Sequence, residues 1–135
     1  MNQQILLKQI ERPRNPSAED DICWFFDSFG IENGRDINHI AMRIILYLLE
    51  NLPETRGIPV EQIASGLEIS SPKVNHHIRN LIDTGIIYRQ KKKIYIRGSS
   101  LRSMVQEIRK DSIRIFDDLE QTAKELDGNF GISDR

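Results

Sequence analysis

The stretch SSPKVNHHIRNLIDTGII, residues 70–87, constrains the fold more than any other part of the sequence. Its apolar residues recur at the spacing of one helix face and are Val74, Ile78, Leu81 and Ile82. Ser70 or Ser71 can cap the start of a helix, and Pro72 fits the first turn, where its missing N–H costs nothing. Gly85 is typical of a helix end. The pattern predicts a short helix with one buried stripe.

The opposite face of this helix carries groups suited to a nucleic-acid groove. The outward residues are Lys73, His76, Arg79 and Asn80, with Asn75 and His77 on the flanks. Asparagine can bond the edge of adenine, and lysine and arginine can reach guanine or phosphate. A solvated polar face is the alternative interpretation of a single helix of this kind.

The adjacent His76 and His77 could instead bind a metal or act in catalysis. Neighbouring helix positions diverge by about 100°, whereas paired metal ligands favour spacings of three or four residues. His39 is remote in the sequence, and Cys23 is the single cysteine. The sequence also lacks G-x-S-x-G, H-E-x-x-H and a glycine-rich phosphate loop. We therefore expect no metal, no cofactor and no enzymatic activity.

Elements on either side extend the pattern. Asp36 is a candidate N-cap for a helix that Pro53 ends, with apolar residues at helical spacing. A loop, PETRGIP, leads to a short helix over 61–67, and the residues EIS connect it tightly to the next helix. After Gly85, IIYRQKKKIYIRG reads as two strands around a lysine-rich turn and predicts a β-hairpin.

The N-terminal segment predicts an arm followed by an aromatic helix. Residues before Pro16 show no clear period, and Ser17 is a candidate N-cap for a helix that Gly30 stops. The apolar stripe of this helix is Ile22, Phe25, Phe26 and Phe29. Trp24 projects from the other side and needs a second surface, which could be a subunit interface, an effector pocket or the core.

The last helix, expected from Ser99 to about Leu126, carries a heptad seam. The seam positions are Leu101, Val105, Ile108, Ser112, Ile115, Leu119, Thr122 and Leu126. Ser112 and Thr122 weaken the seam, and Phe116 broadens it. A seam of this kind calls for a partner helix, and we expect the helix to pack against both its own domain and a second subunit. A single amphipathic helix on its own core is the alternative.

Charge and composition set the class of protein. The net charge of −1 hides a basic block over 73–97, with Asp83 as the single acid, and an excess of acids over 111–135. A localised basic block favours an anionic partner. No stretch has the roughly 18 apolar residues of a membrane span, and the polar start lacks the features of a signal peptide. We expect a soluble, cytoplasmic protein with no membrane partner.

The residues VEQIASGLEISSPKVNHHIRNLIDTGIIYRQKKKIYIRG resemble the winged helix-turn-helix domain of the ArsR and MarR transcription regulators. Ala64 matches the small residue at the helix crossing, and the matching recognition-helix positions are Ser71, Val74, Asn75, His77, Ile78, Leu81, Gly85, Ile86 and Ile87. The cysteine pair of the metal-sensing members is missing, so thiolate metal sensing is not carried over.

The resemblance implies a mainly α fold with a small β-hairpin, and a sequence-specific regulator that binds double-stranded DNA as a homodimer. The expected DNA-binding residues are Ser71, Lys73, Asn75, His76, His77, Arg79, Asn80, Arg89, Lys91, Lys92, Lys93 and Arg97. The expected dimerisation residues are Leu101, Val105, Ile108, Ile115, Leu119, Leu126 and Trp24. An effector ligand stays open, and a winged-helix protein-interaction module is the alternative function.

The expected organisation has four parts. Residues 1–35 form the arm and aromatic helix, 36–98 the winged domain, 99–127 the dimerisation helix and 128–135 a tail.

Overall fold

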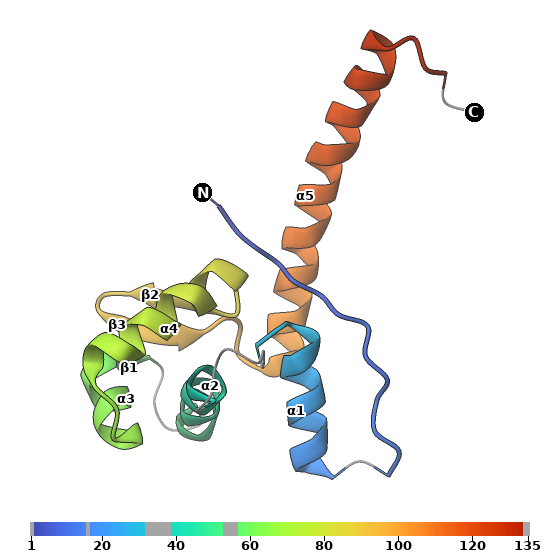
Figure 1. The fold of residues 1–135 in the computed structure, drawn as a ribbon. Helices are drawn as coiled ribbons and strands as arrows, with labels where there is room; N and C mark the ends of the chain where they lie inside the picture. Colours follow the sequence, from blue (N-terminus) through green and yellow to red (C-terminus); the bar gives the residue numbers. More distant parts are fainter. Residues whose placement is uncertain (1, 16, 32–38, 53–56, 134–135) are drawn as a thin grey trace.

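The helix-turn-helix stretch folds as the sequence predicts in the computed structural model, which describes residues 2–15, 17–31, 39–52 and 57–133 (Figure 1). Helix α3 (Val60–Leu67) and helix α4 (Ser71–Thr84) are joined by residues 68–70. Ser70 is the N-cap of α4, because its side chain accepts a hydrogen bond from the Lys73 amide. Gly85 ends the helix with a φ of +90°.

The connection between the two helices is a compact C-terminal cap. Glu68 adopts a φ of +56°, its amide donates to the Ser65 carbonyl, and the Ile69 amide donates to the Ala64 carbonyl. These two bonds satisfy two of the last four carbonyls of α3, and the Leu67 carbonyl accepts a hydrogen bond from the Arg43 side chain.

The wing is a three-stranded antiparallel sheet in the order β1-β3-β2. Strands β2 (Ile87–Gln90) and β3 (Lys93–Ile96) form the predicted hairpin, with Ile87 opposite Ile96 and Tyr88 opposite Tyr95. Strand β1 (Ile58–Pro59) was expected to be part of a loop, and this expectation is wrong. Its backbone pairs with β3, with Ile58 opposite Ile94, and two residues carry no period that a sequence pattern could reveal.

The turn of the hairpin places both central residues in the left-handed region. Lys91 has a φ of +52° and Lys92 a φ of +65°. Two-residue hairpins with positive φ at both positions favour Asn-Gly, because a side chain with a full Cβ raises the energy of this conformation. The two lysines therefore occupy a turn whose backbone conformation favours asparagine and glycine.

We expect Lys91→Asn with Lys92→Gly to raise the free energy of unfolding by about 1 kcal/mol, since both new residues adopt positive φ more readily. Urea denaturation checks this. Tyr88→Phe is the control for a change elsewhere in the exposed wing, and a fall in stability for the Asn-Gly variant would contradict the argument.

Helices α1 and α2 supply the rest of the core. Helix α1 (Ala18–Ser28) is capped by Ser17, as predicted, and Phe26 is fully buried. Helix α2 (Ile40–Asn51) has His39 at its N-cap position, and the proposed cap Asp36 and the proposed stop Pro53 lie outside the described residues. The largest buried side chains come from every layer and include Phe26, Ile44, Ile45, Ile63, Val74, Ile78, Ile94 and Met104.

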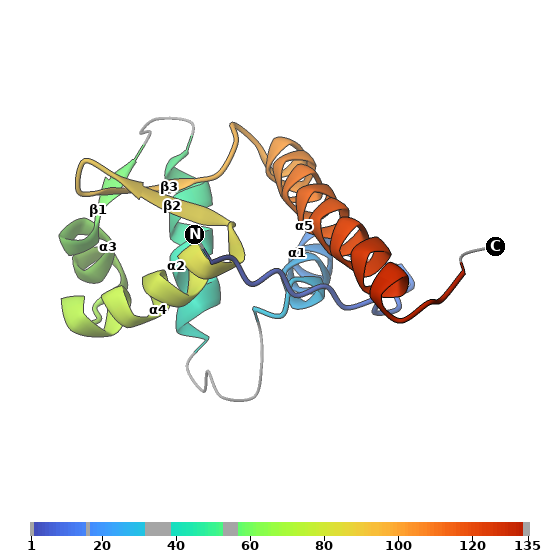
Figure 2. The same ribbon diagram turned by 90° about the horizontal axis from the view of Figure 1, so that it is seen from above.

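Helix α5 (Leu101–Asn129) begins at the N-cap Ser100 and is longer than expected. The predicted tail from Gly128 is wrong at its start, because Gly128 and Asn129 are still helical and Gly131 has the positive φ near the helix end. Figures 1 and 2 show the first part of α5 beside α1 and its second part projecting away from the winged domain. Among the described residues, no helix is both long and apolar enough to cross a membrane.

The N-terminal arm is hydrogen-bonded to α4, to α1 and, through the Gln3 side chain and Asp111, to α5. The Gln4 amide donates to the Asp83 carbonyl of α4 at 2.8 Å, and the Lys8 amide donates to the Ser28 carbonyl of α1 at 2.7 Å. Of the apolar residues of the arm, Ile5 packs on the core, whereas Leu6, Leu7 and Ile10 are exposed.

Candidate nucleic-acid interface

Helix α4 presents a polar face beside the wing. Val74, Ile78 and Leu81 are buried on its inner face. Of the outward residues, Lys73, His76, Arg79 and Asn80 are exposed, and Ser71, Asn75 and His77 are half-buried. Figure 1 shows that α4 lies alongside β2.

A hydrogen bond joins α4 to the wing. The Arg89 Nη2 atom on β2 donates to the Asn75 Oδ1 atom on α4 at 2.8 Å. The sequence predicts that both residues contact DNA. The structure also brings them together, through a contact between residues that lie in different elements.

The two adjacent histidines contact each other edge to face. The ring centroids of His76 and His77 are 5.4 Å apart, and the rings are inclined by 78°. Within the described part of the chain, no three His, Cys, Asp or Glu side chains lie together as metal ligands would. The exposed ring of His76 lies on the same face as Lys73 and Arg79, which suits contact with an anion.

The basic residues of the wing differ in their surroundings. Lys91, Lys92 and Lys93 are exposed at the end of the hairpin. Arg97, which the sequence placed on DNA phosphate, follows β3 at the other end and forms an ion pair with Asp111 of α5. Because this pair compensates the charge of Arg97 within the protein, the wing contacts that we propose for DNA are Arg89 and the three lysines.

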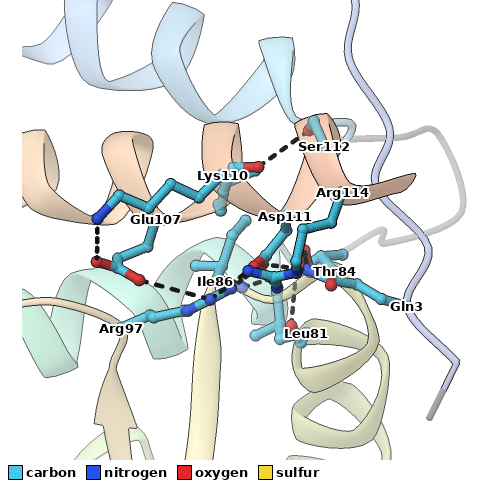
Figure 3. A network of polar contacts seen from close by, with 11 residues as sticks. Gln3, Leu81, Thr84, Ile86, Arg97, Glu107, Lys110, Asp111, Ser112 and Arg114 are labelled. Carbon is cyan, nitrogen blue, oxygen red and sulfur yellow. Dashed lines mark hydrogen bonds and ion pairs between the residues drawn. The ribbon is translucent and has the colours of Figure 1, made fainter. Parts of the chain in front are cut away.

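Asp111 is the centre of a polar network between the winged domain and α5 (Figure 3). Its side chain is 1% exposed and accepts hydrogen bonds from both terminal nitrogens of Arg97, from Arg114 and, at 2.8 Å, from Gln3. The hydrogen bond from Arg97 is the largest cause that lowers the pKa of the Asp111 carboxyl far below its usual range. The same bond raises the pKa of Arg97.

The network also reaches the end of α4. Gln3 Nε2 lies 3.4 Å from the Thr84 carbonyl oxygen, and the Arg97 amide donates to the Ile86 carbonyl at 2.9 Å. Sequence reasoning missed Asp111 and Gln3. The available signal was that Asp111 follows Met104 and Ile108 on one helix face, where a charged residue requires a partner.

The predicted seam of α5 divides into two parts. Ile108 is 3% exposed and lies in the core of its own chain, Leu101 packs against that core, and Val105 is half-buried. Beyond Asp111, apolar side chains face outward, with Phe116 69% and Leu119 59% exposed. Ile108 is therefore corrected from an interface residue to a core residue, because its own domain covers it.

A shallow apolar groove borders the exposed part of α5. Residues of the arm, including Ile5 and Leu7, form one wall, and Ile115, Phe116 and Leu119 form the other. This groove is large enough, at about 450 Å³, to receive side chains of another helix.

Trp24 has partners within its own chain. Its indole Nε1 donates to the Ile10 carbonyl at 2.8 Å, and the Arg12 guanidinium lies 5.7 Å from the ring centre. Arg12 also forms an ion pair with Asp21 at 3.1 Å. The second surface that Trp24 required is the N-terminal arm, and a role of Trp24 in dimerisation stays a prediction.

A family model of known proteins matches the helix-turn-helix part of the chain. Residues 37–88 match the family model described as winged helix-turn-helix DNA-binding, which confirms the predicted winged helix-turn-helix fold over this segment. No curated protein sequence matches the chain. A solved structure, MepR, a transcription regulator of the Staphylococcus aureus multidrug efflux pump MepA, is similar with a TM-score of 0.46 and 20% identity over 84% of each chain.

Proposed function

We propose that the protein is a transcription regulator that binds double-stranded DNA as a homodimer, with α4 in the major groove and the wing on the backbone. The observation that carries this proposal is the exposed polar face of α4, which lies beside a lysine-tipped hairpin within a winged helix-turn-helix domain. A groove-reading helix needs an apolar face held by the domain and a polar face open to the base edges.

The residues of this surface contact different parts of the duplex in the proposed complex, according to how exposed they are. Lys73, His76, Arg79 and Asn80 are exposed and contact base edges or nearby phosphates in the proposed complex. Ser71 and His77, half-buried near the start and middle of α4, contact the backbone. The wing lysines bind phosphate, since an ammonium group recognises it as a point charge.

The second copy completes the regulator. We assign dimerisation to the outer part of α5, where Ile115, Phe116, Leu119 and Leu126 are exposed in a single chain. A two-fold dimer would place two α4 helices on an inverted repeat with half-site centres about one helical turn, roughly 34 Å, apart. We propose that the chain is organised in the four predicted parts, with boundaries after residues 35, 98 and 127. Helix α5 itself continues to Asn129.

The first experiment is fluorescence anisotropy of the protein with random-sequence and genomic duplexes over a salt series. Affinity that falls steeply with salt, with a subset of sequences still bound at high salt, supports a specific regulator. Absence of duplex binding at low salt would contradict the proposal and favour a protein-interaction module.

Changing Lys91, Lys92 and Lys93 to Ala is expected to weaken binding by a similar factor on every duplex. If each lysine neutralises one phosphate, the negative slope of log affinity against log salt becomes shallower by about 2.7. The matched control removes the same charge elsewhere, through Lys8→Ala, Arg109→Ala and Lys124→Ala. An unchanged slope in the wing variant would remove the wing from the interface.

The Asn-Gly variant of the wing turn separates charge from conformation. It removes two of the three positive charges but keeps the hairpin turn, so its loss of affinity should be about two thirds of the loss in the triple variant on the logarithmic scale. Full affinity in this variant would mean that the triple substitution acts through the turn and not through charge.

A further inference from the structure

The bond between Asn75 and Arg89 links the two parts of the proposed DNA-binding surface. In β2, Ile87 is buried and Tyr88 is exposed, so Arg89 leaves the sheet on the same face as Ile87. This face is turned toward α4, and there the guanidinium reaches the Asn75 amide oxygen at 2.8 Å. The arginine is therefore held between the helix and the wing.

The chemistry of the pair fixes the orientation of both side chains. A guanidinium group has five N–H donors and no acceptor, so the atom of Asn75 that faces it is the amide oxygen. One bond to Asn75 holds the planar group and leaves other N–H donors for a second acceptor. A phosphate accepts two parallel N–H bonds from arginine, which makes it the natural acceptor at this position.

The same bond argues against base reading by Asn75. Bidentate recognition of adenine requires both the amide oxygen and the amide nitrogen of the side chain. The oxygen of Asn75 is engaged by Arg89, and the side chain is half-buried, whereas Asn80 on the outer face is exposed.

The comparison with Arg97 shows why a neutral partner matters. Arg97 is bound to the carboxylate of Asp111, so its charge is compensated within the protein. The amide of Asn75 orients Arg89 without compensating its charge. Within the described residues no carboxylate pairs with Arg89, and an oriented arginine of this kind is suited to a phosphate of the duplex.

We infer that Asn75 is a positioning residue that holds the Arg89 guanidinium for a backbone phosphate, so that α4 and the wing grip DNA as one unit. This inference rests on the proposed function. It assigns the two residues one joint role in place of two independent contacts.

A double-mutant cycle on a random-sequence duplex tests the inference, because a phosphate contact requires no known operator. The variants are Asn75→Ala, Arg89→Ala and both together, measured by anisotropy over a salt series, with thermal melting to verify folding. Arg89→Ala is expected to weaken binding about tenfold and to lower the salt slope by about 0.9. Asn75→Ala should cause most of that loss and also lower the slope, and the double variant should be no weaker than Arg89→Ala.

Asn80→Ala is the matched control, since it removes the same amide from α4 without touching Arg89. Its effect should add to that of Arg89→Ala. Additive effects of Asn75→Ala and Arg89→Ala, or an unchanged salt slope in Asn75→Ala, would overturn the inference while leaving duplex binding intact. A wild-type protein that binds no duplex would instead overturn the proposed function, and this inference with it.

Discussion

Asp111→Ala is expected to lower the free energy of unfolding by about 3 kcal/mol at neutral pH, because it removes the buried carboxylate of an ion pair and leaves Arg97 with the more distant carboxylate of Glu107, at 3.8 Å. The carboxylate is 1% exposed and is bonded to Arg97, Arg114 and Gln3. Truncation would leave the half-buried Arg97 without this carboxylate and Gln3 without its acceptor. Urea denaturation at pH 7 measures the loss.

Two variants separate the charge of Asp111 from its shape. Asp111→Asn keeps a side chain of similar size and should lose less stability than Asp111→Ala. Asp118→Ala removes an exposed acid from the same helix and should change stability by less than about 0.5 kcal/mol. A loss below about 1 kcal/mol for Asp111→Ala would contradict the importance of the network.

The effect of Asp111 should depend on pH in one direction. Its pKa is lowered in the folded protein, so the carboxylate contributes its full stabilisation above the unfolded pKa of about 3.9. As the pH falls below that value, the unfolded chain takes up a proton before the folded chain does, and the contribution declines. The stability difference between wild type and Asp111→Asn should therefore narrow below about pH 4.

Features that depend on neighbouring residues were predicted well. The caps at Ser17 and Ser70 and the stop at Gly85 follow from hydrogen bonds within a few residues. The buried stripe of α4 follows from helix periodicity, because three of the four residues that repeat in the sequence are buried in the structure and the fourth, Ile82, is half-buried. Local chemistry therefore determined the helix-turn-helix and the hairpin.

Features that depend on distant partners were not predictable from the same patterns. In the sequence Arg97 resembles the other basic residues of the wing. Its partner Asp111 lies 14 residues further along, on helix α5. Arg89 and Asn75 are equally far apart and meet only because β2 packs on α4. The assignment of such residues to DNA needs the fold as well as the charge.

The heptad seam illustrates a third case, in which the period is correct but the partner changes along the helix. Ile108 and Leu119 both satisfy the seam, yet Ile108 is buried in its own domain and Leu119 is 59% exposed. Periodicity identifies an apolar face and does not say which surface covers it. Variants that test dimerisation must therefore lie beyond Asp111.

Phe116→Glu with Leu119→Glu is expected to convert the proposed dimer into a folded monomer. Both side chains are more than half exposed in a single chain, so charges there should leave the core intact while they prevent a second α5 from covering this face. Losing two interface anchors should raise the dimer dissociation constant by at least about a hundredfold. Light scattering at micromolar concentration measures the mass, and thermal melting verifies the fold.

The control adds the same charge to the other side of the helix. Gln121→Glu with Lys124→Gln changes the net charge by the same amount as the Phe116 and Leu119 substitutions, and both positions are exposed. A dimer in this control and a monomer in the test variant would place the interface on the Phe116–Leu119 face. A wild-type protein that is already monomeric at micromolar concentration would remove the dimer from the proposal. DNA recognition by one α4 helix would then have to account for all of the affinity, because the two-fold half-sites depend on this contact.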